Sequence, residues 1–194
     1  MINGVKYSAS EITVCNSLYH YYECSTGPFL NLSDLPFEEA ERIQKSICKE
    51  GKVFASRRND EYLAVRRALE DRVRNLLIEK GGRPVRERPH YMTLGPCSWL
   101  KEWYVEGCEL SMPLCSFKPE TISFTYGDTF PAMRYQDGKP YRGKVYTVQE
   151  ISGIIETYGL PQEWNKDGKY GPERYIEAQV WDDEPIKRYL GAEL

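Results

Sequence analysis

Residues 175–181 read YIEAQVW, and this stretch decides the fold class. Its apolar side chains alternate with polar and aromatic ones: Ile176, Ala178 and Val180 against Tyr175, Glu177, Gln179 and Trp181. A period of two residues is typical of a β-strand, because successive side chains point to opposite faces of a sheet. We therefore predict a strand with one aliphatic face, and Glu177 projects away from that face.

Other short segments have the composition of strands. An aromatic run at residues 19–23 suits a pleated surface, where aromatic side chains pack well. Later segments are separated by Pro and Gly turns and lie at residues 90–94, 110–114, 122–126 and 144–147. The second half of the chain therefore predicts several strands joined by short connections.

Two long helices are predicted before residue 90. The first begins after Asp34 and ends at Gly51, and the second begins after Asp60 and ends at Gly81. Apolar residues recur at helical spacing in both. The outer face of the second helix is expected to carry Arg66, Glu70 and Arg74.

Two shorter helices are expected among the strands, one at residues 98–105 and one that opens with the capping box of Thr147 and Glu150. Helices that gather early and strands that gather late favour an α+β fold with a mostly antiparallel sheet in the C-terminal half. A doubly wound parallel sheet would alternate them regularly. No repeat or linker divides the chain, so we expect a single domain over residues 1–194.

The composition is that of a globular protein. The chain has 194 residues, of which 41% are hydrophobic and 28% are charged, which argues against disordered and fibrous classes. There is no basic segment followed by an apolar run at the start, and no apolar stretch long enough to span a membrane. We therefore expect a cytoplasmic protein that is neither exported nor anchored.

The cysteines show no metal-binding pattern. The six lie at positions 15, 24, 48, 97, 108 and 115, and no two form the C-x-x-C pair of zinc and redox sites. We expect no metal centre. A chain of this size without an export signal has no need of disulfides, so free thiols are expected.

Positive charge is concentrated in one segment. Residues 52–88 hold eleven Lys and Arg against six Asp and Glu, a balance of +5, while the net charge of the whole chain is −3. Such an excess attracts phosphate groups, but the solvated face of a surface helix gives the same pattern. Both interpretations stay open.

Several common kinds of active site are excluded by motif. The chain has only His20 and His90, and it contains neither the G-x-S-x-G elbow of serine hydrolases nor the glycine-rich loops of Rossmann and P-loop nucleotide sites. Candidate chemistry therefore comes from three scattered places: Leu18-Tyr19-His20 in the early strand, Tyr91 in a middle strand, and Glu177 in the late strand.

This order of histidine, tyrosine and glutamate resembles the ADP-ribosyltransferase superfamily, and most closely its DNA-modifying toxin branch. In that family a Gly-initiated short strand that ends in serine follows the first helix, and Gly51, Phe54 and Ser56 are the candidates here. The glutamate is often followed by a proline, as Glu177 is by Pro185. The segment 107–144 has no counterpart in the family pattern.

The resemblance implies a function and a set of roles. The substrate would be NAD, and the acceptor of ADP-ribose would be a nucleic acid or a protein. Glu177 would stabilise positive charge on the ribose, His20 would orient the ribose, and Tyr91 would stack on nicotinamide. Tyr62 and Tyr126 are alternatives for the stacking residue. Near Ser56, Arg57 and Arg58 would hold the pyrophosphate, because guanidinium groups pair with phosphate in a bidentate way.

Two other functions are compatible with the sequence. The first is a noncatalytic module that binds nucleic acid or a protein partner through its arginine-rich helix and exposed aromatic residues. The second is a hydrolase that uses Asp128 and Glu177 as a pair of carboxylates. Asp128 belongs to the segment TYGDTFP at residues 125–131, where a Gly-Asp turn stands between aromatic residues.

Overall fold

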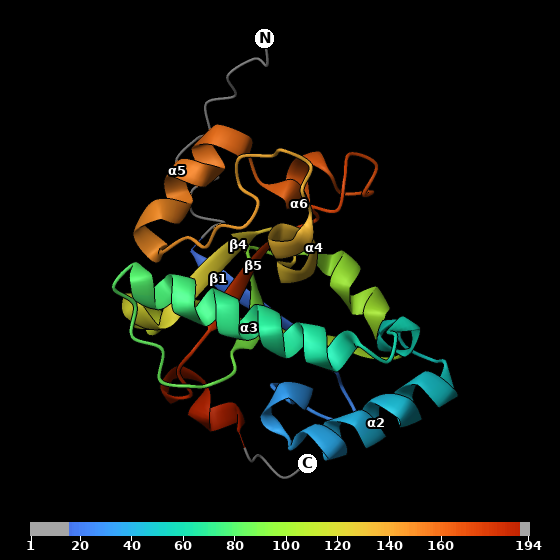
Figure 1. Ribbon diagram of the computed structural model, residues 1–194. Helices are drawn as coiled ribbons and strands as arrows, with labels where there is room; N and C mark the ends of the chain where they lie inside the picture. The colour runs from blue at the N-terminus through green and yellow to red at the C-terminus, as the bar shows by residue number, and fades with distance from the viewer. Residues whose placement is uncertain (1–15, 191–194) are drawn as a thin grey trace.

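The computed structural model describes residues 16–190, which form an α+β fold around one five-stranded sheet (Figure 1). The strand order is β3-β1-β2-β5-β4, and every pairing between neighbours is antiparallel. The strands are β1 (Ser17–Glu23), β2 (His90–Leu94), β3 (Gly107–Pro113), β4 (Ile122–Tyr126) and β5 (Ile176–Val180). The predicted fold class is confirmed, and the decisive segment is β5, next to the edge strand β4.

The two long predicted helices are also confirmed. They are α2 (Phe37–Glu50) and α3 (Tyr62–Glu79). Helix α2 ends where Gly51 adopts a left-handed conformation, with φ of 68°. Three shorter helices follow: α4 (Thr129–Arg134), α5 (Val148–Tyr158), which the predicted capping box opens, and α6 (Pro161–Trp164).

Two local predictions were wrong. The segment at 144–147 forms no strand, because it reaches the sheet through a single bridge between Phe124 and Tyr146 before α5 begins. The resemblance implied a short strand that ends in Ser56, but Phe54–Arg57 is a 3-10 helix. That helix packs against α2, and it is not one of the strands of the sheet.

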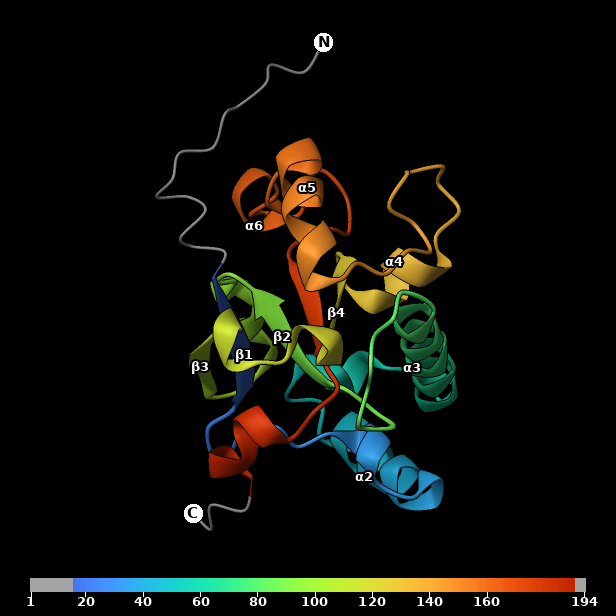
Figure 2. The same ribbon diagram turned by 90° about the vertical axis from the view of Figure 1, so that its left-hand side faces the viewer.

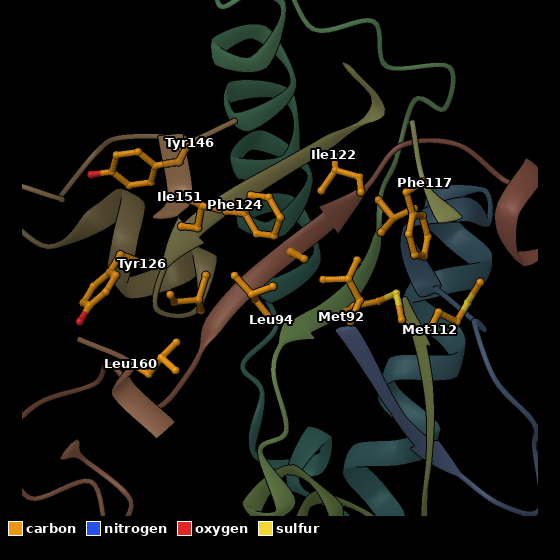
Figure 3. Close-up of a cluster of buried hydrophobic side chains, with 14 of the residues drawn as sticks. Met92, Leu94, Met112, Phe117, Ile122, Phe124, Tyr126, Tyr146, Ile151 and Leu160 are labelled. Carbon is orange, nitrogen blue, oxygen red and sulfur yellow. The ribbon is translucent and has the colours of Figure 1, made fainter. Parts of the chain in front are cut away.

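One face of the sheet carries the main hydrophobic core. Met92, Leu94, Ile122 and Phe124 lie on this aliphatic face, and each is at most 2% exposed (Figure 3). Other buried members of the cluster come from the segments that cover this face: Phe117, Tyr146, Ile151, Leu160 and Ile186. The three aliphatic residues of β5 belong to the same cluster, as their spacing predicted.

The opposite face of the sheet is the polar face, and α3 lies across it (Figure 1). Leu69, Val73 and Leu77 of α3 pack against Trp181, which follows β5. Helix α2 contacts α3 and lies beside it, on the side away from α4 (Figure 2). The region between the start of α3, the 3-10 helix at Ser98–Trp103 and the polar face holds the site described below.

The expectation of free thiols was wrong for one pair of cysteines. Cys24, just after β1, forms a disulfide with Cys108 of the edge strand β3. The register brings them together, because Tyr22 pairs with Cys108 and Glu23 with Gly107. Cys48, Cys97 and Cys115 are free, and Cys15 lies outside the described residues. Spacing along the chain gave no sign of a pair that is 84 residues apart.

Between residues 16 and 190, no helix combines the length and the apolar character that crossing a membrane requires.

Candidate functional site

A cavity of about 1400 Å³ opens over the polar face of the sheet. Its walls are largely aromatic: Tyr62, Tyr91, Trp99, Trp103, Tyr104 and Phe130. Six acidic residues, among them Asp128 and Glu177, and three arginines border the same space. Ligand sites are typically concave and mostly apolar, with a few convergent polar groups. The cavity has these properties and exceeds the volume of common small-ligand pockets.

Glu177 is fixed at the floor of this cavity. It is 6% exposed, and its neighbours on the adjacent strands are Thr93 and Thr125. Its Oε1 accepts hydrogen bonds from the backbone N–H of Thr129 at 3.2 Å, from the Thr129 hydroxyl at 2.5 Å and from Gln179 Nε2 at 3.1 Å. No donor contacts Oε2 among the described residues, so this oxygen is the one left for a ligand.

The hydrogen bonds continue along the polar face. Trp181 Nε1 donates to Ser123 Oγ at 2.9 Å, and Ser123 Oγ donates to Gln179 Oε1 at 2.8 Å. The amide nitrogen of Gln179 donates in turn to Thr125, Thr129 and Glu177. Connected hydrogen bonds of this kind restrain the side chains that they join. The carboxylate of Glu177 is therefore held in one orientation by strands β4 and β5.

The environment of Glu177 favours its neutral form. Burial raises the pKa of the Glu177 carboxyl to about 8, the nearby negative charge of Asp128 adds to the rise, and the donors from Thr129 and Gln179 oppose it. Strongly perturbed carboxyl groups in a cavity are typical of functional sites. The free protein therefore holds a proton on Glu177 near neutral pH.

Asp128 stands beside Glu177 at the start of α4. Its Oδ1 caps the helix by accepting from Phe130 N at 2.8 Å, and its Oδ2 accepts from the hydroxyl of Tyr175 at 3.0 Å. Asp128 directly precedes Thr129, whose backbone N–H and hydroxyl contact Glu177, and both carboxyl groups border the cavity. The turn predicted at residues 125–131 is thus a strand end followed by a capped helix.

Tyr91 is anchored at both its hydroxyl and one ring face. The hydroxyl donates to Glu70 Oε1 at 2.9 Å, and the guanidinium of Arg66 lies 4.6 Å from the ring centroid. Glu70 is 1% exposed and also accepts from Arg66 Nε and Ser33 Oγ, each at 2.9 Å. The expectation that Glu70 and Arg66 lie on an outer face of the helix was wrong, because these charges pair above the sheet.

The surroundings of the three candidate stacking tyrosines differ. Tyr126 is 0% exposed in the core on the aliphatic face. Tyr62 has Phe130 stacked at 5.0 Å and the Arg58 guanidinium at 4.2 Å from its ring. Tyr91 borders the cavity and, among the residues that the structure describes, has a ring contact with Arg66 alone. A planar ligand therefore has its best access to Tyr91.

His20 borders the cavity but lies on a different face of the sheet from Glu177. Alternation along β1 puts its ring on the same face as Leu18, which is opposite the face of Glu177. Its two ring nitrogens are occupied, since Nδ1 contacts Tyr91 O at 2.9 Å and Nε2 accepts from Phe29 N at 2.9 Å. Burial lowers the pKa of His20 to about 4, so the ring is neutral.

The basic residues near the 3-10 helix separate into two groups. Arg58 borders the cavity beside Tyr62. Arg57 is exposed with its guanidinium 5.6 Å from the ring of Phe54, and the hydroxyl of Ser56 donates to Val53 O at 2.6 Å. Ser56 and Arg57 do not line the cavity. The structure thus brings Arg58 together with Glu177 and Tyr91.

Most arginines of α3 are committed to contacts within the protein. Arg67 donates to Leu35 O at 2.5 Å, and Arg72 donates to Met133 O at 3.0 Å. Arg74 donates to Arg86 O and Pro84 O, each at 3.2 Å. These three guanidinium groups therefore connect neighbouring loops to the helix.

The sequence analysis assigned no role to two residues that position Glu177, namely Thr129 and Gln179. For Gln179 a signal was present, because its predicted strand face is the one that carries Glu177. Thr129 follows Asp128, and an Asp-Thr pair after a glycine is a signal for the start of a helix. Its contact with Glu177 spans 48 residues, so local patterns do not contain it.

Among residues 16–190, no group of His, Cys, Asp and Glu has the arrangement of a metal site. Comparison with known proteins found no matching family model, no matching curated protein and no matching solved structure. The interpretation of the site therefore depends on its own geometry.

Proposed function

We propose that this protein is an NAD-dependent transferase of the ADP-ribosyltransferase type. The observation that carries the proposal is Glu177, whose carboxyl group is oriented by three donors at the floor of a large aromatic cavity. The volume of about 1400 Å³ suits a dinucleotide. The acceptor would be a nucleic acid or a protein, and a cytoplasmic place of action, expected from the sequence, belongs to the same proposal.

The chemistry requires a carboxylate near developing positive charge. Bound NAD would supply the ADP-ribosyl group: its bond to nicotinamide breaks, the electron pair leaves with nicotinamide, and positive charge develops on the ribose. Glu177 Oε2, which no described residue contacts, would stabilise that charge in a site shielded from water. The pKa of Glu177 is raised to about 8 in the free protein. A positive nicotinamide ring beside this carboxyl would favour its charged form, so Glu177 would release its proton to solvent as the substrate enters.

Other residues of the cavity have supporting roles in this proposal. Tyr91, held by Glu70 and Arg66, would stack on the nicotinamide ring. Arg58 would pair with the pyrophosphate, and Asp128 would accept the proton that the attacking acceptor loses. His20, through its bond to Tyr91 O, supports β2 from the other face and would act on the ribose only by giving up one of its present hydrogen bonds.

The first test measures binding and nicotinamide release with NAD as the probe. Millimolar NAD should raise the midpoint of thermal unfolding by roughly 5 to 10 °C if its concentration is about 100 times the dissociation constant. Glu177→Gln should abolish nicotinamide release with little loss of binding. The matched control is Glu163→Gln, an exposed carboxyl outside the cavity lining, which should behave as the native protein.

The products separate the alternatives. Label transferred from NAD to nucleic acid or protein supports the transferase, and release of free ADP-ribose alone supports a hydrolase that uses Asp128 with Glu177. If NAD neither binds nor is consumed by the native protein, the proposal is wrong. Binding of nucleic acid that falls steeply with salt and is unaffected by Glu177→Gln would then favour the noncatalytic module.

A further inference from the structure

A second hollow, which we call the basic hollow, lies beside the main cavity. It has a volume of about 440 Å³, and Tyr135, which is 52% exposed, borders both spaces. Four basic side chains line it: Arg72, Arg134, Lys139 and Arg142. They come from α3, from the last residue of α4 and from the loop that follows α4. None of them has a role in the function proposed above.

The charges around the basic hollow do not balance. Lys139 and Arg142 share two carboxylates, Asp137 and Glu173. Arg72 and Arg134 have no carboxylate partner among the described residues, which leaves four positive and two negative charges, or a local charge of +2. A concave site with uncompensated positive charge attracts anions.

Arg142 carries an unused hydrogen-bond donor. Its side chain is 7% exposed, its Nε and Nη2 donate to Asp137 at 3.0 and 2.8 Å, and Nη2 also lies 2.5 Å from Glu173 Oε1. Its Nη1 is buried and has no hydrogen-bond partner within the described part of the chain. A buried donor without a partner is unfavourable, and a bound acceptor would supply the missing hydrogen bond.

Two glycines shape the loop that lines the basic hollow. Gly138 and Gly143 both adopt positive φ, of 75° and 68°. A Cβ added at Gly143 would lie 3.2 Å from Arg72 Nη2. A side chain at position 143 would therefore displace the guanidinium of Arg72, whereas glycine allows this guanidinium to lie beside the loop.

We propose that the basic hollow is a phosphate-binding site. Among the described residues, Arg134 has its whole guanidinium group available, Arg72 uses only Nη1, on Met133 O, and Arg142 has Nη1 left over. Such guanidinium donors suit the oxygens of a phosphate group. The group would come either from a small phosphate ester or from the phosphodiester backbone of a nucleic acid strand that passes Tyr135 from the main cavity. Neither source requires NAD to bind, so this proposal can fail or succeed independently of the proposed function.

The experiment measures binding of two probes to the full-length protein at low salt. Pyrophosphate is titrated by calorimetry, and a fluorescent single-stranded oligonucleotide is titrated by anisotropy. The variant Arg72→Gln/Arg134→Gln should weaken the affinity for the bound probe by about tenfold or more, since each charge-assisted hydrogen bond contributes about 1.5–3 kcal/mol. The control is Arg42→Gln, an exposed arginine on α2, which should leave the affinity unchanged.

Each outcome decides the proposal or its ligand. Arginine-dependent binding of pyrophosphate alone identifies a small phosphate ester, and arginine-dependent binding of the oligonucleotide identifies a phosphodiester strand. Binding of neither probe, or binding that all variants share, overturns the proposal. If the double variant fails to fold, Arg134→Gln alone serves, because this exposed residue has no side-chain contact to lose among those described.

Discussion

The two faces of the sheet are built from the same strands but have opposite chemistry. On β2 and β5, Met92 and Ala178 pair on the aliphatic face, and the next pair, Thr93 and Glu177, lies on the polar face. All four residues are buried. The aliphatic face is filled by apolar side chains, and the polar face is filled by a hydrogen-bonded network beneath a cavity.

The aliphatic face mainly stabilises the fold, whereas the polar face carries the candidate site at a cost in stability. Apolar burial stabilises the fold by roughly 25 cal/mol for each Å² removed from water, whereas buried polar groups contribute only when they are paired. The raised pKa of Glu177 means that its charged form is incompletely compensated in the fold. A buried group of this kind lowers the stability of the fold. Functional sites often show this trade-off, in which residues that serve activity reduce stability.

The largest expected effect is on the aliphatic face. Phe124→Ala removes a ring that is 0% exposed, and it should lower the free energy of unfolding by about 3–5 kcal/mol, because a cavity remains. Denaturant unfolding measures the loss. Val85→Ala, at a side chain that is 69% exposed, should change it by less than about 0.5 kcal/mol. Equal effects at the two positions would contradict the assignment of the core.

A smaller loss is expected above the polar face. Glu70→Gln leaves the buried Arg66 without its carboxylate, so the free energy of unfolding should fall by about 3 kcal/mol. Tyr91 also loses an anionic acceptor, so binding of NAD should weaken together with stability. Glu41→Gln, in an exposed pair with Lys45, is the control and should cost little. If Glu70→Gln left both the free energy of unfolding and the affinity for NAD unchanged, the buried charges would not be coupled to Tyr91.

The third effect depends on pH. The pKa of Glu177 is raised from 4.5 to about 8 in the folded protein, so between pH 5 and 8 the folded state keeps a proton that the unfolded state has released. The contribution of Glu177 to stability therefore falls as pH rises through this window. Glu177→Gln has no group at this position that ionises in this range, so its stability should not fall in the same way. The free energy of unfolding of the variant minus that of the native protein should therefore be larger at pH 8 than at pH 5, by roughly 2 kcal/mol or more.

Thermal unfolding at several pH values measures this difference, with Glu163→Gln as the control. Parallel stability curves for the native protein and Glu177→Gln would show that Glu177 ionises normally. In that case the polar face would not differ from an ordinary buried surface in its electrostatics.

Much of the fold was predictable because it depends on neighbours in the chain. The alternation at 175–181 gave β5 and its two faces, and the glycine at position 51 ended α2 as predicted. The strand expected at 144–147 was wrong because one bridge to Phe124 does not extend into a ladder. Short apolar segments do not reveal how many partners the backbone will find.

The candidate site was predictable in part. Glu177, Tyr91, Arg58 and His20 all border one cavity, but Ser56 and Arg57 do not line it. His20 lies on the face of its strand opposite to that of Glu177. A one-residue shift along a strand reverses the face of a side chain. A match of three letters at residues 18–20 therefore identified the strand, but not which of its side chains share a face with Glu177.

The sequence by itself determined the α+β class, the two long helices and the two faces of β5, because backbone periodicity and helix ends depend on residues only a few positions apart. The tertiary structure alone decided that Glu70 is buried, that Cys24 meets Cys108, and that Thr129 holds Glu177. Burial, pairing and pKa depend on atoms that the order of the strands brings together from distant parts of the chain, and no local pattern contains that order.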